Sequence, residues 1–134
     1  MQFTELGGNL AFEFFVPGVA AGTAVEWPQF VMPWNATITG LTWVPGAAVT
    51  ANGSNFATIS VRNRGAAGSG SVVPASRSYA ATNSTAQVAE VLTLSSTATD
   101  LQPSTNDVLT ISVAHSGTGL TIPAGLVQVS LRLR

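Results

Sequence analysis

The chain lacks cysteine and lysine, and it contains few charged residues of either sign. Without cysteine it can form no disulfide bond, thiolate zinc site or catalytic thiol. Charged residues make up 8% of its 134 residues, the net charge is −1, and all five cations are arginines. A nucleic-acid-binding surface needs several phosphate contacts from basic side chains. We therefore expect no nucleic-acid partner.

Long apolar runs and targeting signals are also missing. The most apolar stretch, residues 11–21, is interrupted by Glu13, Pro17 and Gly18. No uninterrupted apolar run approaches the roughly 18 residues of a membrane-spanning helix. The first ten residues have neither the basic region nor the apolar core of a secretory signal. We expect no membrane partner, and a cytoplasmic location at least until an assembly leaves the cell.

A surface so poor in charge must consist mainly of Ser, Thr, Asn, Gln, Gly and Ala. Hydroxyl and methyl groups cost much less to desolvate than ammonium or carboxylate groups. Such a surface favours contact with other protein. It is equally typical of a small β-domain from a GC-rich genome, and the two interpretations are compatible.

Alternation of apolar and polar residues with a period of two predicts β-strands throughout. In the last strand, Val127, Val129, Leu131 and Leu133 face one way, and Gln128, Ser130, Arg132 and Arg134 face the other. No helical stripe occurs. About eight short strands separated by turn residues predict an all-β chain, a single-domain β-sandwich that is jelly-roll-like. We assign residues 11–134 to the sandwich and residues 1–10 to an N-terminal arm.

The central segment, residues 37–65, is expected to form a β-hairpin with a wide loop. The alternation changes phase near Gly40, which predicts a β-bulge there. Residues 88–95 are expected to form one strand, with Glu90 on an open face or paired with an arginine. Pro28 cannot donate a ladder hydrogen bond, so residues 24–32 should form an edge strand or two short strands.

Catalytic signatures are weak, and we expect no enzyme. Hydrolysis by paired carboxylates would have to draw on Glu13, Glu26, Glu90, Asp100 and Asp107, and nothing in their spacing predicts that any two meet in a cleft. A Ser-His-Asp triad is possible in number, but no Gly-x-Ser-x-Gly elbow supports it. A sandwich-type hydrolase remains open if two carboxylates converge in a cleft.

Metal and cofactor sites are not expected. The single histidine, His115, is in phase with apolar residues, so it is interpreted as a residue at the edge of the core. Asp100, Asn106 and Asp107 could bind calcium across a turn, although Asn-Asp before a strand is more typical of turn capping.

The aromatic residues lie mainly in the first half of the chain and are interpreted first as core filling. A stacking platform for sugars, as in carbohydrate-binding modules, is the alternative. Trp34, which follows Pro33 in a turn, is the best candidate for an exposed ring.

Two segments resemble small β-sandwich proteins encoded among bacteriophage head genes. They are ITGLTWVPGAAVTANGSNFATISVRNRGAAGSGS, and downstream NDVLTISVAHSGTGLTIPAGLVQVSLRL. The resemblance covers residues 37–133 and includes no catalytic signature. Asn106 stands where that family's ending usually has glycine, whereas Asp107 matches.

The resemblance implies a structural virion protein that decorates or cements the outer capsid surface after assembly in the cytoplasm of a bacterial host. Its implied partners are the major capsid protein and further copies of itself, with a trimer as the expected form. Apolar spots in the arm suggest an added strand or a side chain in a groove of the shell. The expected partner contacts are Gln2, Phe3, Thr4, Leu6 and Trp34. A carbohydrate-binding module of a virion tail or head fibre is the alternative.

Overall fold

The computed structural model describes residues 8–134, which form nine strands and one short 3-10 helix. The strands are β1 (Asn9–Val16), β2 (Val25–Val31), β3 (Ala36–Pro45), β4 (Phe56–Asn63), β5 (Val72–Ser78), β6 (Glu90–Val91), β7 (Thr93–Leu94), β8 (Val108–Ser116) and β9 (Gly125–Leu133). The helix η1 (Ala98–Leu101) precedes β8. The prediction of an all-β chain is confirmed.

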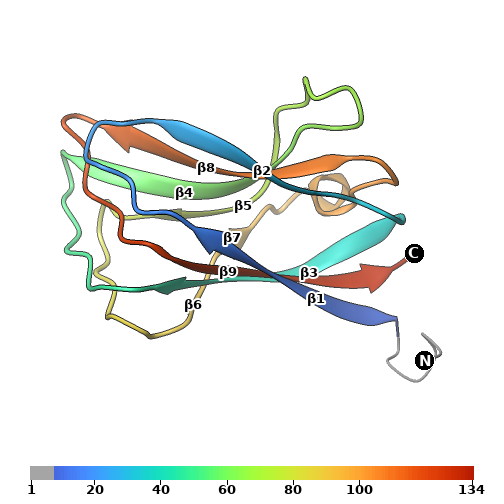
Figure 1. The fold of residues 1–134 in the computed structure, drawn as a ribbon, viewed down its shortest axis with the longest axis horizontal. Coiled ribbons are helices and arrows are strands. Elements are labelled where there is room, and N and C mark those ends of the chain that lie inside the picture. The colour runs from blue at the N-terminus through green and yellow to red at the C-terminus, as the bar shows by residue number, and fades with distance from the viewer. Residues whose placement is uncertain (1–7) are drawn as a thin grey trace.

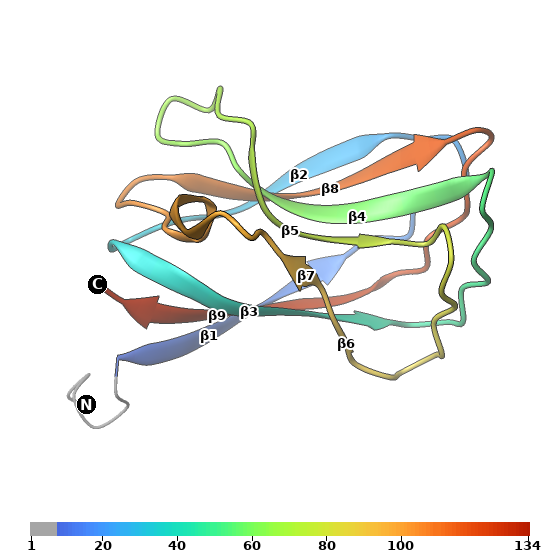
Figure 2. The same ribbon diagram turned by 180° about the vertical axis from the view of Figure 1, so that it is seen from behind.

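The strands form two packed antiparallel sheets, seen as two layers in Figures 1 and 2. The four-stranded β1 sheet has the order β1-β9-β3-β6, and the five-stranded β2 sheet has the order β2-β8-β4-β5-β7. Apart from the two-residue β7, this is the strand order of a jelly roll, whose eight strands wind between two sheets. The predicted jelly-roll-like sandwich is therefore confirmed.

The core lies between the sheets and is built from the inward halves of the alternating strands. Ala57, Ile59 and Val61 of β4 are buried, as are the inward residues of β9, Val127, Val129 and Leu131. Trp43, Tyr79 and Met32 are the largest fully buried side chains. The alternation in the sequence thus identified the core faces of these strands correctly.

The predicted hairpin over residues 37–65 is wrong, because its two strands belong to different sheets. β3 pairs with β9 and β6, whereas β4 pairs with β5 and β8. Alternation reports which side of a strand is buried but not which strand lies beside it. The predicted bulge is confirmed, since the register of β3 and β9 shifts between Ile38 and Gly40.

One strand expected at a sheet edge lies there, and one expected continuous strand is divided. β2 is an edge strand, as Pro28 predicted, and its register shifts between Pro28 and Phe30. The single strand expected over 88–95 is instead β6 in one sheet and β7 in the other, with Leu92 buried between them. The chain crosses between the sheets there, which a continuous strand cannot do.

The N-terminal boundary differs from the sequence assignment. β1 begins at Asn9, so the last two residues assigned to an arm belong to the sheet. Residues 1–7 lie outside the described part of the chain.

Candidate functional site

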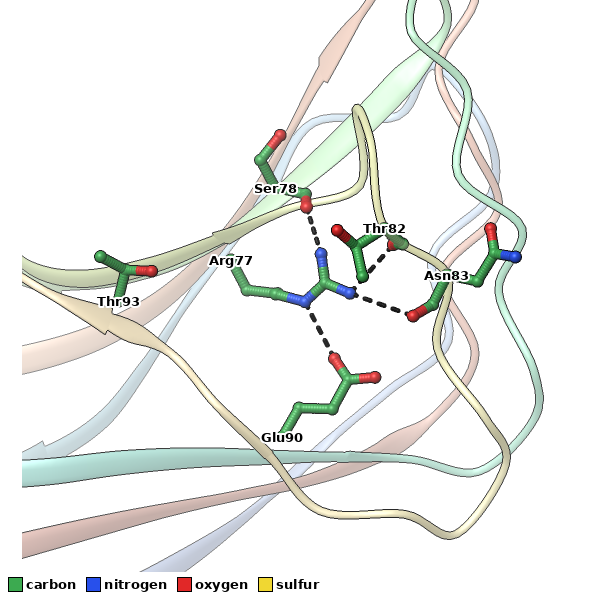
Figure 3. A pocket seen from close by; sticks show the side chains of 6 residues that line it. All are labelled: Arg77, Ser78, Thr82, Asn83, Glu90 and Thr93. Atoms are coloured by element: carbon green, nitrogen blue, oxygen red, sulfur yellow. Dashed lines mark hydrogen bonds and ion pairs between the residues drawn. The ribbon is translucent and has the colours of Figure 1, made fainter.

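A surface hollow lies where the chain crosses between the sheets (Figure 3). Its volume is about 490 Å³, and it is lined by Arg77, Ser78, Thr82, Asn83, Glu90 and Thr93. Figure 3 shows Arg77 reaching from β5 between Glu90 and the turn of residues 78–83. The hollow thus combines groups from β5, β6, β7 and one loop.

The Arg77 guanidinium is held by protein groups on every side. Its Nε donates to Glu90 Oε2 at 2.9 Å, Nη1 donates to the Ser78 carbonyl, and Nη2 donates to the Thr82 carbonyl at 3.0 Å. Arg77 belongs to the β2 sheet and Glu90 to the β1 sheet. The ion pair therefore bridges the two layers, and the arginine partner predicted for Glu90 is confirmed.

A buried polar network lies beneath this ion pair. The Arg77 Cζ lies 4.4 Å from the centre of the Tyr79 ring. The Tyr79 hydroxyl accepts from Trp43 Nε1 at 2.9 Å and from Ser84 Oγ at 2.8 Å. Burial raises the pKa of Tyr79 above its usual value, because the phenolate would be desolvated. The hydroxyl thus satisfies the indole N–H inside the core.

The charged groups of this hollow connect the two sheets. Its opposite charges are paired with each other, and its other lining groups are hydroxyls and an amide. No aromatic ring lines the hollow, so it offers a sugar no ring to stack on.

A second polar cluster covers the outer face of the β2 sheet. Glu26 of β2 accepts from Arg64 Nε at 2.6 Å, from Thr110 Oγ1 at 2.5 Å and from Arg62 Nη1 at 3.4 Å. The hydrogen bond from Arg64 is the main cause that lowers the pKa of Glu26 to about 2. A hollow of about 290 Å³ beside it is lined by Glu26, Arg62 and Ser112 together with Ala24, Val25, Val113 and Ala114.

The residues considered for catalysis or metal binding lie in separate local interactions. His115 Nε2 is 3.0 Å from the Thr23 carbonyl oxygen. Asp100 accepts from Ser95 Oγ at 2.6 Å, and Asp107 accepts from Asn63 Nδ2 at 2.7 Å. Within residues 8–134, no three His, Cys, Asp or Glu side chains form a group that could hold a metal ion. In the same range, no helix is long and apolar enough to cross a membrane.

Of the five residues expected to contact a partner, the structure describes only Trp34. Gln2, Phe3, Thr4 and Leu6 fall outside the described residues. Trp34 lies in the turn between β2 and β3, where 38% of its surface is exposed. Trp43, by contrast, is fully buried.

Within residues 8–134, the most exposed aromatic ring belongs to a residue that was not predicted to be exposed. Phe15 of β1 is 67% exposed, whereas Phe12 and Phe14 pack against the core. The signal was present, because Phe15 is out of phase with its two aromatic neighbours. Large exposed aliphatic residues also occur at Val31, Val72, Val73, Val88 and Val91.

Comparisons with known proteins identify no family for this chain. No family model and no curated protein matches the chain. Among solved structures, this protein is similar to a chain in a structure of the infectious bursal disease virus Gx strain, with a TM-score of 0.43 and 9% sequence identity. The alignment covers 93% of this chain and 32% of that chain, so this protein spans about a third of the viral chain's length.

Proposed function

We propose that this protein is a structural component of a bacteriophage virion that decorates or cements the outer surface of the capsid. The proposal rests on the resemblance of residues 37–133 to small sandwich proteins of phage head genes. The proposed partners are the major capsid protein and further copies of this chain. Jelly rolls occur in viral capsids, lectins and cupins, so the fold is compatible with this role without deciding it.

The observation that supports the proposal most directly is the nature of the surface. Only 8% of residues are charged, and Arg62, Arg64 and Arg77 already form ion pairs within the chain. A surface of hydroxyl, amide and methyl groups loses little free energy when it is desolvated against a matching protein surface. A protein that coats a shell needs such contacts over a broad area.

The copy number per purified virion tests the proposal. Quantitative mass spectrometry would compare this chain with the major capsid protein in particles of the phage that encodes it. A ratio close to stoichiometric is expected for a decoration or cement protein. A few copies per particle would move the protein to the tail or fibres, and its absence from the particle would refute a virion role.

Attachment through the N-terminal segment can be tested separately. Because β1 begins at Asn9, the deletion must end at Gly7 to leave the sheet intact. We expect removal of residues 1–7 to abolish binding to shells that lack the protein, with unchanged thermal unfolding. Full binding by the truncated chain would refute a role for Phe3 and Leu6.

A carbohydrate-binding module of a fibre is the second candidate, and the exposure of Trp34 favours it. A stacking ring typically contributes on the order of 1 kcal/mol or more to binding. Glycan-array binding that is lost in Trp34→Ala would support this function. An array without signal would leave the capsid proposal as the better one.

A further inference from the structure

Three of the four sheet edges carry features that prevent pairing with another strand. β6 and β7 are each only two residues long. β2 contains Pro28 and a register shift between Pro28 and Phe30. Short strands, proline and bulges are the usual means by which β-proteins protect their edges.

The fourth edge, β1, carries none of these features. Its eight residues pair with β9 without a register shift from Asn9 to Val16, and they include no proline or lysine. Glu13 is its one charged residue. Figures 1 and 2 show β1 at the border of its layer, with no other described strand on its outer side.

The hydrogen-bonding direction along β1 follows from its first contact with β9. Leu133 N donates to the Gly8 carbonyl at 3.0 Å, so Gly8 belongs to a hydrogen-bonded pair of the ladder. Such pairs alternate along an antiparallel ladder. The N–H and C=O groups of Asn9, Ala11, Glu13 and Phe15 therefore point away from β9, toward the open edge.

We propose that β1 pairs antiparallel with β1 of a second copy about a two-fold axis at Phe12. The four-stranded sheets of the two copies then form one continuous sheet. Ala11 lies opposite the partner's Glu13, and Asn9 lies opposite the partner's Phe15. In this register every outward N–H and C=O of Asn9, Ala11, Glu13 and Phe15 has a main-chain partner.

The side chains fit the same register. Phe12 lies opposite the partner's Phe12 in a non-hydrogen-bonded pair, where facing side chains are closest. Phe12 and Phe14 already stack on Phe30 of β2, with ring centroids 5.3 and 5.1 Å apart. The contact therefore extends an aromatic cluster that is only partly buried in one copy.

Charge favours a second copy as the occupant and selects this register. With a net charge of −1, two copies repel each other little. Glu13 faces an alanine here, whereas the register centred on Glu13 would place two carboxylates directly opposite each other. A second copy also supplies an identical β1 strand, so no molecule other than this chain is needed to complete the edge.

This inference rests on the geometry of the edge and not on the proposed virion role. Isologous pairing closes after two copies, because each β1 edge is used once. The phage-family resemblance implied a trimer instead. The mass of the assembly in solution separates the two.

Sedimentation over a range of concentrations tests the pairing. The full chain is expected to sediment as a concentration-dependent dimer. Ala11→Pro removes an outward N–H and no bond to β9, so it should raise the dimer dissociation constant at least tenfold while the monomer stays folded. A monomer at every concentration, a trimer, or a dimer unaffected by Ala11→Pro would overturn the proposal.

The register has its own test at position 11. Ala11→Lys places a cation opposite the partner's Glu13 and should tighten the dimer about fivefold, whereas Ala11→Glu should weaken it about fivefold. Ala66→Lys and Ala66→Glu, in the exposed loop after β4, are the matched controls and should change nothing. Equal effects of the two charges at position 11 would overturn the register.

Amide hydrogen exchange distinguishes a second copy from other occupants of the edge. In the dimer the amides of Ala11, Glu13 and Phe15 should gain protection as concentration rises, while those of Phe12 and Phe14 are protected throughout. Protection of Ala11 that is independent of concentration and lost on removing residues 1–7 would assign the edge to the chain's own N-terminal segment. That result would overturn pairing between copies.

Discussion

At the scale of single residues, several buried and half-buried polar groups of this protein are paired with partners far away in the sequence. Glu26 of β2 contacts Arg64, which follows β4, and Thr110 of β8 on the outer face of one sheet. Tyr79 connects Trp43 and Ser84 inside the core. The contacts of Glu26 and the bond from Trp43 to Tyr79 join segments that the sequence separates widely, so they stabilise the tertiary arrangement.

Glu26 should make the stability of the protein depend on acid. Its pKa is about 2 in the folded chain and about 4.5 without its partners, so its contribution is complete above pH 4.5 and is lost as the pH falls toward 2. Because the group is partly exposed, we expect about 1–2 kcal/mol. Glu26→Gln should lower the free energy of unfolding at pH 7 by that amount and flatten its decline below pH 5.

Urea unfolding at several pH values measures this effect. Arg132→Gln, which removes a charge from an exposed position of β9, is the control and should keep the slope of the unmodified chain. An equally steep decline in Glu26→Gln would contradict the assignment.

The Tyr79 hydroxyl should be worth more than either of its hydrogen bonds alone. Tyr79→Phe leaves the buried Trp43 N–H without an acceptor and should cost about 1–3 kcal/mol. Ser84→Ala removes one donor but keeps the bond from Trp43, so its cost should be smaller. Chemical denaturation of both variants checks the order, and a larger loss for Ser84→Ala would contradict it.

At the scale of elements, close contacts between strands depend on particular glycines. Gly125 begins β9 opposite Pro45, at the end of β3. A Cβ at position 125 would lie 2.5 Å from Trp43 Cη2 and would also contact the Val44 carbonyl oxygen. The packing of the largest core side chain therefore requires a residue without a side chain on the neighbouring strand.

Gly125→Ala should destabilise the fold by about 1–3 kcal/mol and change the fluorescence of Trp43, because backbone or indole must move. Gly53→Ala is the matched control, since its Cβ would have its nearest neighbour, the Ala80 carbonyl oxygen, at 3.7 Å. Thermal unfolding followed by tryptophan fluorescence measures both variants. Equal stability of the two would show that the β9–β3 contact adapts without cost.

At the scale of the whole molecule, the winding of the chain makes the two sheets interdependent. Strands β1 to β4 alternate between the layers, and β9 returns to pair between β1 and β3. Neither sheet can form completely before almost the whole chain is in place. The inward faces of both sheets then share a single core.

We therefore expect one cooperative unfolding transition. Far-ultraviolet circular dichroism, which reports both sheets, and tryptophan fluorescence, to which the buried Trp43 contributes, should give the same midpoint in urea. Refolding should take milliseconds to seconds, because pairings such as Asn9 with Arg132 join distant parts of the chain. Two separate midpoints would contradict a shared core.

Local sequence patterns specify the strands, their buried faces and several local irregularities. Val127, Val129 and Leu131 could be placed in the core because alternation has a period of two, and Gly40 and Pro28 marked a bulge and an edge. These features depend on neighbouring residues alone. The exposure of Phe15 was also present in that alternation, although it was not used.

Which strands pair and which side chains meet depends instead on how the whole chain folds. The expected hairpin of β3 and β4 failed, and the strand expected at 88–95 divided between two sheets. The cluster around Glu26 and the open edge at β1 likewise arise only when β2, β4, β8 and β9 take their places. Pairing is set by the total burial of many strands, a quantity that no local pattern contains.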